Sequence, residues 1–490
     1  MGLVPGGIVT EPQLLRLFGQ SRHPDADALE ASRLAAGDPP AVARRAGAMG
    51  RTVTRTGVDL VFRPPGSVQV LWALRDGVTR RLIEAAVDRA IEPVLAEVER
   101  DAVVRWGKAG IHHAHPPGGM VAAGFRHYTS RAGTPLLHVH LVVSVKCRRP
   151  DGAWGSAHTP VFFENTVAWS ALFNELVMAE VCQALGLATE PRTVTQGRRP
   201  VMELAGIPHE LIHWLSIRGR HIDQRRTELE RDYLTTATTA AMEADDGTPA
   251  CRPVVVTERT RTALNRIAAR QTRPPKPPQA QPLHRLGASW RADAVRRFGA
   301  ELVDGLLARA RAAAAVIRAR LHGVVVDVAA AAAYVTGVMA VMKRGRFRRR
   351  HLLAEARRHL AHTLHGKSRA PGLDHRIVQE ALTVHCRELT APDTPADREV
   401  AATHRLYRTR VPLPPELTAL EEQTPAALTG PDGIPRPPLR YDQATAAGRW
   451  LREQFLVLGS SRRCPMPVAP RHWSASPPGH TGRSRGGPGA

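Results

Sequence analysis

The chain has 490 residues and is strongly basic, with 68 Lys and Arg against 45 Asp and Glu and a formal net charge of +23 at pH 7. Its length is sufficient for two or three domains. A positive excess of this size favours a polyanionic partner, most simply nucleic acid, with a merely solvated basic surface as the alternative.

The cysteine pattern and the hydropathy further limit the class of protein to which this chain can belong. Five scattered cysteines, none in CxxC spacing, argue against a disulfide framework and a zinc ribbon. The start of the chain lacks the basic and apolar regions of a signal peptide. The most apolar stretch, residues 323–342, is interrupted by Asp327 and rich in alanine and valine. We therefore expect a buried or amphipathic helix there, no membrane insertion, and a location in the cytoplasm.

Residues 1–240 show the mixed periodicities of a globular domain with strands and helices. A strand is predicted at "GVDLVF", ended by two prolines, and "GGMVAAGFRHYT" and "TPLLHVHLVVSVKC" are predicted to form a hairpin through the loop "SRAG". Apolar residues at helical spacing predict helices at 78–104, 163–185 and 208–229.

The composition changes after residue 240. Pro-rich stretches indicate a linker over 241–287, and an Ala/Arg/Leu-rich segment predicts a helical region over 288–390. From 391 to 490 Pro, Arg, Thr and Gly dominate, which predicts a disordered tail.

Three histidines in the predicted hairpin form a candidate metal site. His138 and His140 are two residues apart on one strand, so their side chains leave the same face. His127 lies on the partner strand, and the hairpin can bring it level with the pair. Three neutral imidazoles on one face can hold a divalent ion with positions left for substrate oxygens. Ordinary strand histidines in a His-rich chain are the alternative.

These motifs resemble the relaxase domain of TrwC/TraI-type (MobF) conjugative relaxases. The similarity runs from "GVDLVFRPPGSVQVLWAL" through "AAGFRHYTSRAGTPLLHVHLVVS" to "ELAGIPHELIHWLSIRGRHIDQRRTELE", about residues 1–235. It implies an α+β fold of the HUH endonuclease type, with an antiparallel sheet flanked by helices. The helical region that follows resembles the family's linker between relaxase and helicase.

The resemblance also implies a reaction. In such relaxases a single strand of transfer-origin DNA binds to the HUH domain, and a tyrosine attacks the scissile phosphate during plasmid mobilisation. By resemblance, His127, His138 and His140 would hold a divalent metal ion (Mg, Mn or Zn) that polarises this phosphate. Asp59 would support the histidine cluster or the attacking tyrosine. Relaxosome or other conjugation proteins are further implied partners.

Two departures from the family pattern leave the enzymatic activity open. The family's nucleophilic tyrosines precede the segment that the start of this chain resembles. The first tyrosine here, Tyr128, should point away from His127, because neighbouring strand residues face opposite sides. Gly66 stands where the family usually has the lysine of its "PKSVS" turn. The chain could be a relaxase without its tyrosine as written, or a catalytically inactive DNA-binding remnant or accessory protein.

Arginines near the hairpin are candidates for phosphate contacts. Arg126, Arg131, Arg148 and Arg149 flank the histidines in the sequence and could follow a DNA backbone. Solvated surface charge is the alternative explanation for each of them.

Two other motifs point to different chemistry. "HELIH", His209 to His213, matches the HExxH pattern of zinc proteases, although Ser216 and Gly219 stand where that class usually has a glycine and a third ligand. A zinc protease is therefore a further alternative. "AHTLHGKS", residues 361–368, fits a loose P-loop pattern, but a helix predicted to run up to Gly366 leaves no preceding strand.

Overall fold

The computed structural model describes residues 6–108, 112–194, 199–243, 256–275, 281–343, 345–390 and 405–410, together with residue 3 and two short strands at 428–429 and 435–436. It combines helices with antiparallel sheets, which confirms the predicted α+β class. None of the described helices is long and apolar enough to cross a lipid bilayer.

The elements have the following bounds. The helices are α1 (Glu11–Leu14), η1 (Leu15–Gly19), α2 (Ala26–Ala35), α3 (Pro40–Ala46), α4 (Gly66–Leu74), α5 (Gly77–Asp101), α6 (Pro160–Leu185), α7 (His209–Leu215), α8 (Ile217–Glu243), α9 (Glu258–Gln271), α10 (Leu283–Phe298), α11 (Ala300–Arg320), α12 (Val328–Met342), α13 (Arg349–Leu364), α14 (Leu373–Glu380) and η3 (Ala381–His385). The strands are β1 (Gly57–Phe62), β2 (Val104–Trp106), β3 (His112–Ala114), β4 (Ala122–Thr129), β5 (Pro135–Ser144), β6 (Lys146–Arg148), β7 (Trp154–Ala157), β8 (Thr189–Arg192), β9 (Val201–Leu204), β10 (Arg346–Arg348), β11 (Cys386–Glu388), β12 (Leu406–Thr409), β13 (Leu428–Thr429) and β14 (Pro435–Arg436).

An antiparallel sheet with the order β1-β5-β4 lies at the centre of the first part of the chain. The predicted strand and hairpin are all present in it. Along β5, buried and partly exposed residues alternate, with Leu137, Val139, Leu141 and Val143 on the buried side. This period of two gives the sheet an inner face for the core and an outer face for other contacts.

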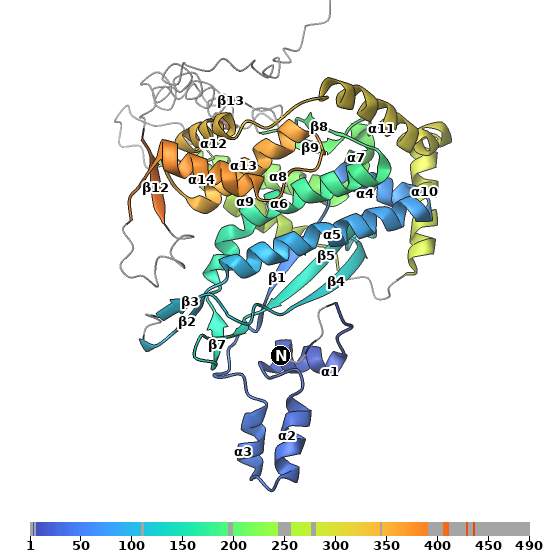
Figure 1. Ribbon diagram of the computed structural model, residues 1–490. Helices are drawn as coiled ribbons and strands as arrows, with labels where there is room; N and C mark the ends of the chain where they lie inside the picture. Colours follow the sequence, from blue (N-terminus) through green and yellow to red (C-terminus); the bar gives the residue numbers. More distant parts are fainter. Residues whose placement is uncertain are drawn as a thin grey trace, which may run out of the picture.

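Helices α5 and α6 cover the inner face of this sheet (Figure 1). Phe62 of β1 contacts Phe173 of α6, with ring centroids 5.1 Å apart. Helix α4 packs on β5 and adds buried side chains, including Trp72, to the same core. The short helices α1 to α3 lie on the other side of the sheet from α5 (Figure 1). The hydroxyl of Thr56 donates to the carbonyl of Phe18, which ties this N-terminal segment to the start of β1.

Two predicted segments differ in the structure. The helix expected at 208–229 is divided into α7 and α8 at Ser216, whose hydroxyl bonds back to the carbonyl of Ile212. A serine that bonds to its own backbone competes with the helical ladder at this point. The stretch 241–287 contains helix α9, which Thr257 caps by accepting a hydrogen bond from the amide of Thr260.

The described residues 328–343, 345–390 and 405–410 contain a second core. Helices α12, α13 and α14 pack with the sheet β10-β12-β11 around apolar side chains that include Phe347, Leu360 and Tyr407. Asp327 accepts hydrogen bonds from the amides of Ala329 and Ala330, so the charge that interrupts the apolar stretch is the N-cap of α12. Most of the predicted tail, 391–490, lies outside the described residues.

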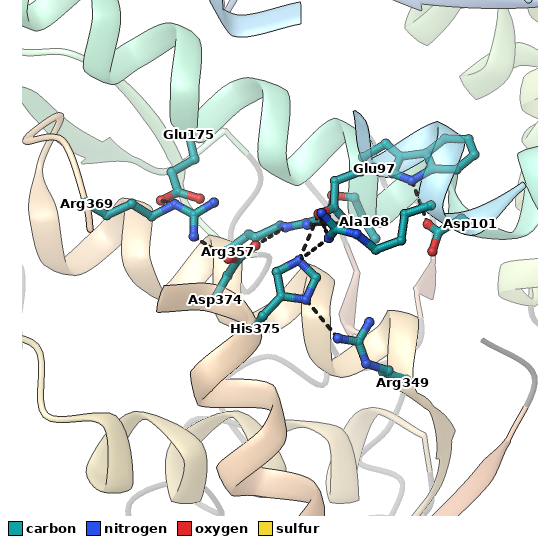
Figure 2. Close-up of polar contacts among 11 residues, drawn as sticks. Glu97, Asp101, Ala168, Glu175, Arg349, Arg357, Arg369, Asp374 and His375 are labelled. Carbon is teal, nitrogen blue, oxygen red and sulfur yellow. Dashed lines mark hydrogen bonds and ion pairs between the residues drawn. The ribbon is translucent and has the colours of Figure 1, made fainter. Parts of the chain in front are cut away.

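A buried arginine joins the two cores (Figure 2). Arg357 of α13 has no exposed surface, and its guanidinium lies 3.1 Å from Glu97 of α5 and donates to Asp374 of α14 at 2.8 Å. It also donates to the carbonyl of Ala168 in α6, at 2.9 Å. One side chain therefore bonds four helices together. His375 completes this arrangement at 2.8 Å from Glu97.

We expect Arg357→Met to destabilise the protein by about 3–5 kcal/mol, because it leaves two buried carboxylates without their shared cation. Urea denaturation at pH 7 followed by tryptophan fluorescence measures this loss. Arg296→Met is the matched control, because the Arg296 side chain is 74% exposed where it pairs with Asp293, so the pair should contribute less than about 1 kcal/mol. Equal losses in the two variants would contradict the role given to Arg357.

The same cluster predicts a dependence of stability on acidic pH. Burial alone would raise the pKa of Glu97, but the hydrogen bond from His375 and the charge of Arg357 outweigh burial and lower this pKa from 4.5 to about 2. A lowered carboxyl pKa stabilises the folded state above the unfolded value, and this stability is lost as the pH falls from about 4.5 towards 2. We expect the thermal midpoint to fall over this interval.

Glu97→Gln tests the assignment of this acid sensitivity. The variant should be less stable at pH 7 and should lose less of its remaining stability between pH 4.5 and 2.5 than the unmodified chain does. Thermal melts followed by circular dichroism at several pH values measure both quantities. An unchanged acid slope in Glu97→Gln would show that other carboxylates cause it.

Candidate metal centre

The three predicted histidines converge on the outer face of the central sheet. His127 of β4 is directly opposite His138 of β5, and His140 is two residues further along β5. Their ring centroids are 4.9–5.2 Å apart, and one potential ligand atom from each lies within 4.8 Å of the others. In the part of the chain that the structure describes, this is the only group of three or more His, Cys, Asp or Glu side chains with such spacing.

Two of the rings are held by acceptors behind them. The Nδ1 of His140 lies 2.8 and 3.0 Å from the two carboxylate oxygens of Asp59, which is on the neighbouring strand β1. The Nδ1 of His138 lies 2.8 Å from the carbonyl oxygen of Leu136. An N–H donated from Nδ1 leaves Nε2 as the lone-pair nitrogen, which is the atom a metal would need. The residues present therefore fit a divalent ion.

The local electrostatics favour a neutral imidazole at His138. Burial lowers the pKa of His138, and the neighbouring His140, His127 and Arg63 lower it further, against the opposing hydrogen bond to Leu136. A lowered histidine pKa means that the ring is uncharged at neutral pH. Neutral imidazole is the form that binds metals.

A glutamine from a helix fixes the backbone beside His138. The side chain of Gln69 in α4 is buried, accepts from the amide of Leu137 at 2.7 Å and donates to the carbonyl of Leu137 at 2.8 Å. It also donates to the carbonyl of Pro64 at 3.3 Å, where β1 has ended. Gln69 thus makes the hydrogen bonds to the backbone of Leu137 that a longer β1 strand would otherwise make. Its sequence context, a helix with an apolar face, does not signal this role.

Three further side chains surround the histidines on the outer face. Val61 of β1 and Phe125 of β4 are the cross-strand neighbours of His140, and they remain 54% and 38% exposed. Arg63, which directly follows β1, is exposed and close enough to lower the pKa of His138. None of the three is among the site residues predicted from the sequence. The alternation of Asp59 and Val61 in β1, continued by Arg63 directly after the strand, is the signal that could have identified Val61 and Arg63.

A family model gives the decisive comparison. The model described as TrwC relaxase matches residues 1–297, more than half of the chain. The chain belongs to the TrwC relaxase family.

Individual relatives cover smaller parts. The multifunctional conjugation protein TraI of Escherichia coli is 32% identical over 164 residues, and that of strain K12 is 32% identical over 165. Each match covers 32% of this chain and only 9% of the relative, so the chain spans less than a tenth of the length of these relatives.

Solved structures of the conjugative relaxase TrwC with oriT DNA are also similar to this chain. The copper-bound structure is 24% identical, with a TM-score of 0.38, and the match covers 56% of this chain and 80% of that one. A metal-bound structure is 23% identical, also with a TM-score of 0.38, and covers 54% and 86%.

The tyrosine next to His127 points away from the three histidines, as predicted. Tyr128 stacks on Trp72 of α4 with the ring centroids 5.7 Å apart and the planes 8° from parallel. It therefore faces the core side of the sheet, whereas His127 faces the outer side. A register shift between His127 and Thr129 makes the end of β4 irregular without reversing this orientation.

The prediction that Arg126 contacts a phosphate is wrong. Arg126 forms ion pairs with Glu84, at 3.5 Å, and with Asp88, both on α5 at the inner face. Of the other three arginines, Arg148 lies over the ring of Trp154 and Arg149 pairs with Asp151, whereas Arg131 is exposed in the hairpin loop. Strand alternation accounts for Arg126, since it adjoins His127.

The turn at Gly66, where the family resemblance leads us to expect a lysine, has other contacts in this chain. The carboxylate of Glu203 accepts hydrogen bonds from the amide and hydroxyl of Ser67, at 2.8 and 2.6 Å, at the start of α4. A Cβ on Gly66 would lie 2.5 Å from the side chain of Ile212. A lysine therefore does not fit at Gly66 in this packing. The carboxylate of Glu203 already accepts the hydrogen bonds that the start of α4 could otherwise donate to a bound anion.

The competing motifs lack the structures that their chemistry needs. His209 and His213 lie together on α7, with ring centroids 4.3 Å apart, but Arg192 is 2.8 Å from Nδ1 of His209. No third metal-ligating side chain joins them among the described residues. In the P-loop-like stretch, α13 extends to Leu364, and Gly366 packs against Cys182. Neither a zinc-protease centre nor a phosphate loop is formed there.

Proposed function

We propose that this relaxase-family chain binds single-stranded transfer-origin DNA on the outer face of the β1-β5-β4 sheet, with a divalent ion held by His127, His138 and His140. The observation that carries the proposal is the convergence of three imidazoles, two of them oriented by Asp59 and by the Leu136 carbonyl. Family membership supports it. We place this activity in the cytoplasm, together with other conjugation proteins.

The surrounding residues suit a nucleic-acid strand. A divalent ion, when bound, would polarise a phosphate oxygen. Arg63 would provide a fixed positive charge for the same or the next phosphate. Val61 and Phe125 leave apolar surface exposed on either side of His140, and Phe125 is a candidate stacking partner for a base.

We further propose that the chain as written binds DNA without becoming covalently linked to it. Tyr128 stacks on Trp72 beneath the sheet, and the other described tyrosines, Tyr233, Tyr334 and Tyr407, belong to α8, α12 and β12. Tyr441 lies outside the described residues. A metal-dependent adduct with transfer-origin DNA on denaturing gels, lost in a single tyrosine variant, would contradict this proposal and identify a nucleophile.

Metal binding gives the first test. We expect isothermal titration with Mn²⁺ or Zn²⁺ to show one site, lost in His138→Ala because a ligand is removed. Asp59→Ala should keep the site but weaken it about 10–100-fold, because the His140 ring loses the acceptor that orients it.

His213→Ala is the matched control for the metal site. It removes a histidine from the HELIH motif, so it should leave affinity and stoichiometry unchanged. If metal binding were lost in His213→Ala and retained in His138→Ala, the metal would bind at the HELIH motif, and the proposal would be overturned.

Arg63 provides the test of strand binding. With a fluorescent single-stranded transfer-origin oligonucleotide and Mn²⁺, we expect Arg63→Ala to weaken binding about tenfold, because one charge-assisted phosphate contact is lost. Arg81→Ala removes an exposed arginine from α5, across the sheet, and should have little effect. Equal affinities in the two variants would exclude this outer-face path for the strand.

A further inference from the structure

The described elements between residues 328 and 410, outside the match to the relaxase family, have the order of a winged helix. Helix α12 is followed by β10, then by the helix pair α13 and α14, and then by β11 and β12. The sheet order β10-β12-β11 is antiparallel throughout. This helix–strand–helix–helix–strand–strand arrangement extends a helix-turn-helix unit by a small sheet, and helix-turn-helix units commonly bind DNA.

The helix end that would read bases is already occupied. In a helix-turn-helix unit, residues at the N-terminus of the second helix contact base edges. Here Asp374 and His375, at the start of α14, bond to Arg357 of α13 and Glu97 of α5 (Figure 2). Asp374 is buried and His375 is partly covered, so the two side chains at this end of α14 are held against α13 and α5. Sequence readout of the usual kind is therefore blocked.

The sheet of this unit presents a row of arginines instead. Arg408 in the central strand β12 is directly opposite Arg346 in β10 and Arg387 in β11. All three are exposed, while the alternate residues Phe347 and Tyr407 are buried against the helices. Directly opposed cross-strand residues share a face, so the three guanidinium groups leave the sheet side by side.

The charges in this row have no acidic partner in the described chain. No ion pair involves Arg346, Arg387 or Arg408 there, and the one acidic residue in these strands, Glu388, pairs with Arg405 at 3.3 Å. Residues 328–390 and 405–410 contain fifteen Lys and Arg and four Asp and Glu. Like charges placed directly opposite each other destabilise a sheet, and bound phosphates would relieve this repulsion.

We propose that this arginine row binds the sugar–phosphate backbone of duplex DNA without reading its sequence. Three strands at the usual spacing place the outer arginines roughly 10 Å apart, so their long side chains can reach successive phosphates. Strand β12 lies at a different edge of the molecule from β4 and β5 (Figure 1). The duplex site is therefore separate from the single-strand site proposed above and does not depend on it.

The test uses the full chain and a fluorescent duplex of arbitrary sequence. We expect Arg346→Gln, Arg387→Gln and Arg408→Gln together to weaken duplex binding at least tenfold. The slope of log affinity against log salt should become shallower by about 2 to 3, because up to three phosphate contacts are lost. The single substitution Arg408→Glu, at the centre of the row, should have a similar effect on affinity.

A matched triple variant separates the row from general loss of charge. Arg81→Gln, Arg309→Gln and Arg320→Gln remove three exposed arginines from α5 and α11 and should change duplex binding less than threefold. The row variant should keep its metal binding and its single-strand affinity, and His138→Ala should keep duplex binding. A row variant no weaker than the matched control, or duplex binding lost in His138→Ala, would overturn the proposal.

Discussion

Direct pairing of His127 with His138 across the β4–β5 hairpin determines which side of the sheet carries the histidine group. Because strand side chains alternate, a slip of one residue would turn His138 inward and expose Leu137 and Val139 to water. Leu137 and Val139 belong to the core that the sheet shares with helices α4, α5 and α6. The register that buries them is therefore also the register that puts the histidines on the outer face. The apolar core thus fixes the register of the polar site.

The features that could be predicted from the sequence depend on local periodicity. The hairpin follows from two alternating runs around "SRAG", and the shared face of His138 and His140 follows from their spacing. The inward orientation of Tyr128 follows from its position next to His127. The hydrogen bond between His140 and Asp59 does not follow from spacing, because the two residues are 81 positions apart. The family resemblance implies only that Asp59 supports the histidine cluster or the attacking tyrosine.

The features that were missed depend on contacts between distant segments. The charge of Arg126 alone indicates a phosphate contact, whereas its acidic partners on α5 are apparent only in the structure. Arg357 is one of many arginines in a basic region, and only the packing of four helices distinguishes it. The row through Arg346 and Arg408 joins strands that are about 60 residues apart, so neither spacing nor composition reveals it.

Gln69 constrains how the sequence around the histidine group can change during evolution. Pro64 has no N–H and ends the pairing of β1, and Gln69 supplies both a donor and an acceptor to Leu137 at that place. Glutamate would lack the donor and leucine would lack both groups, leaving buried backbone unsatisfied beside a candidate ligand. The two positions are therefore expected to covary: a chain that loses the proline can extend the strand and dispense with the glutamine.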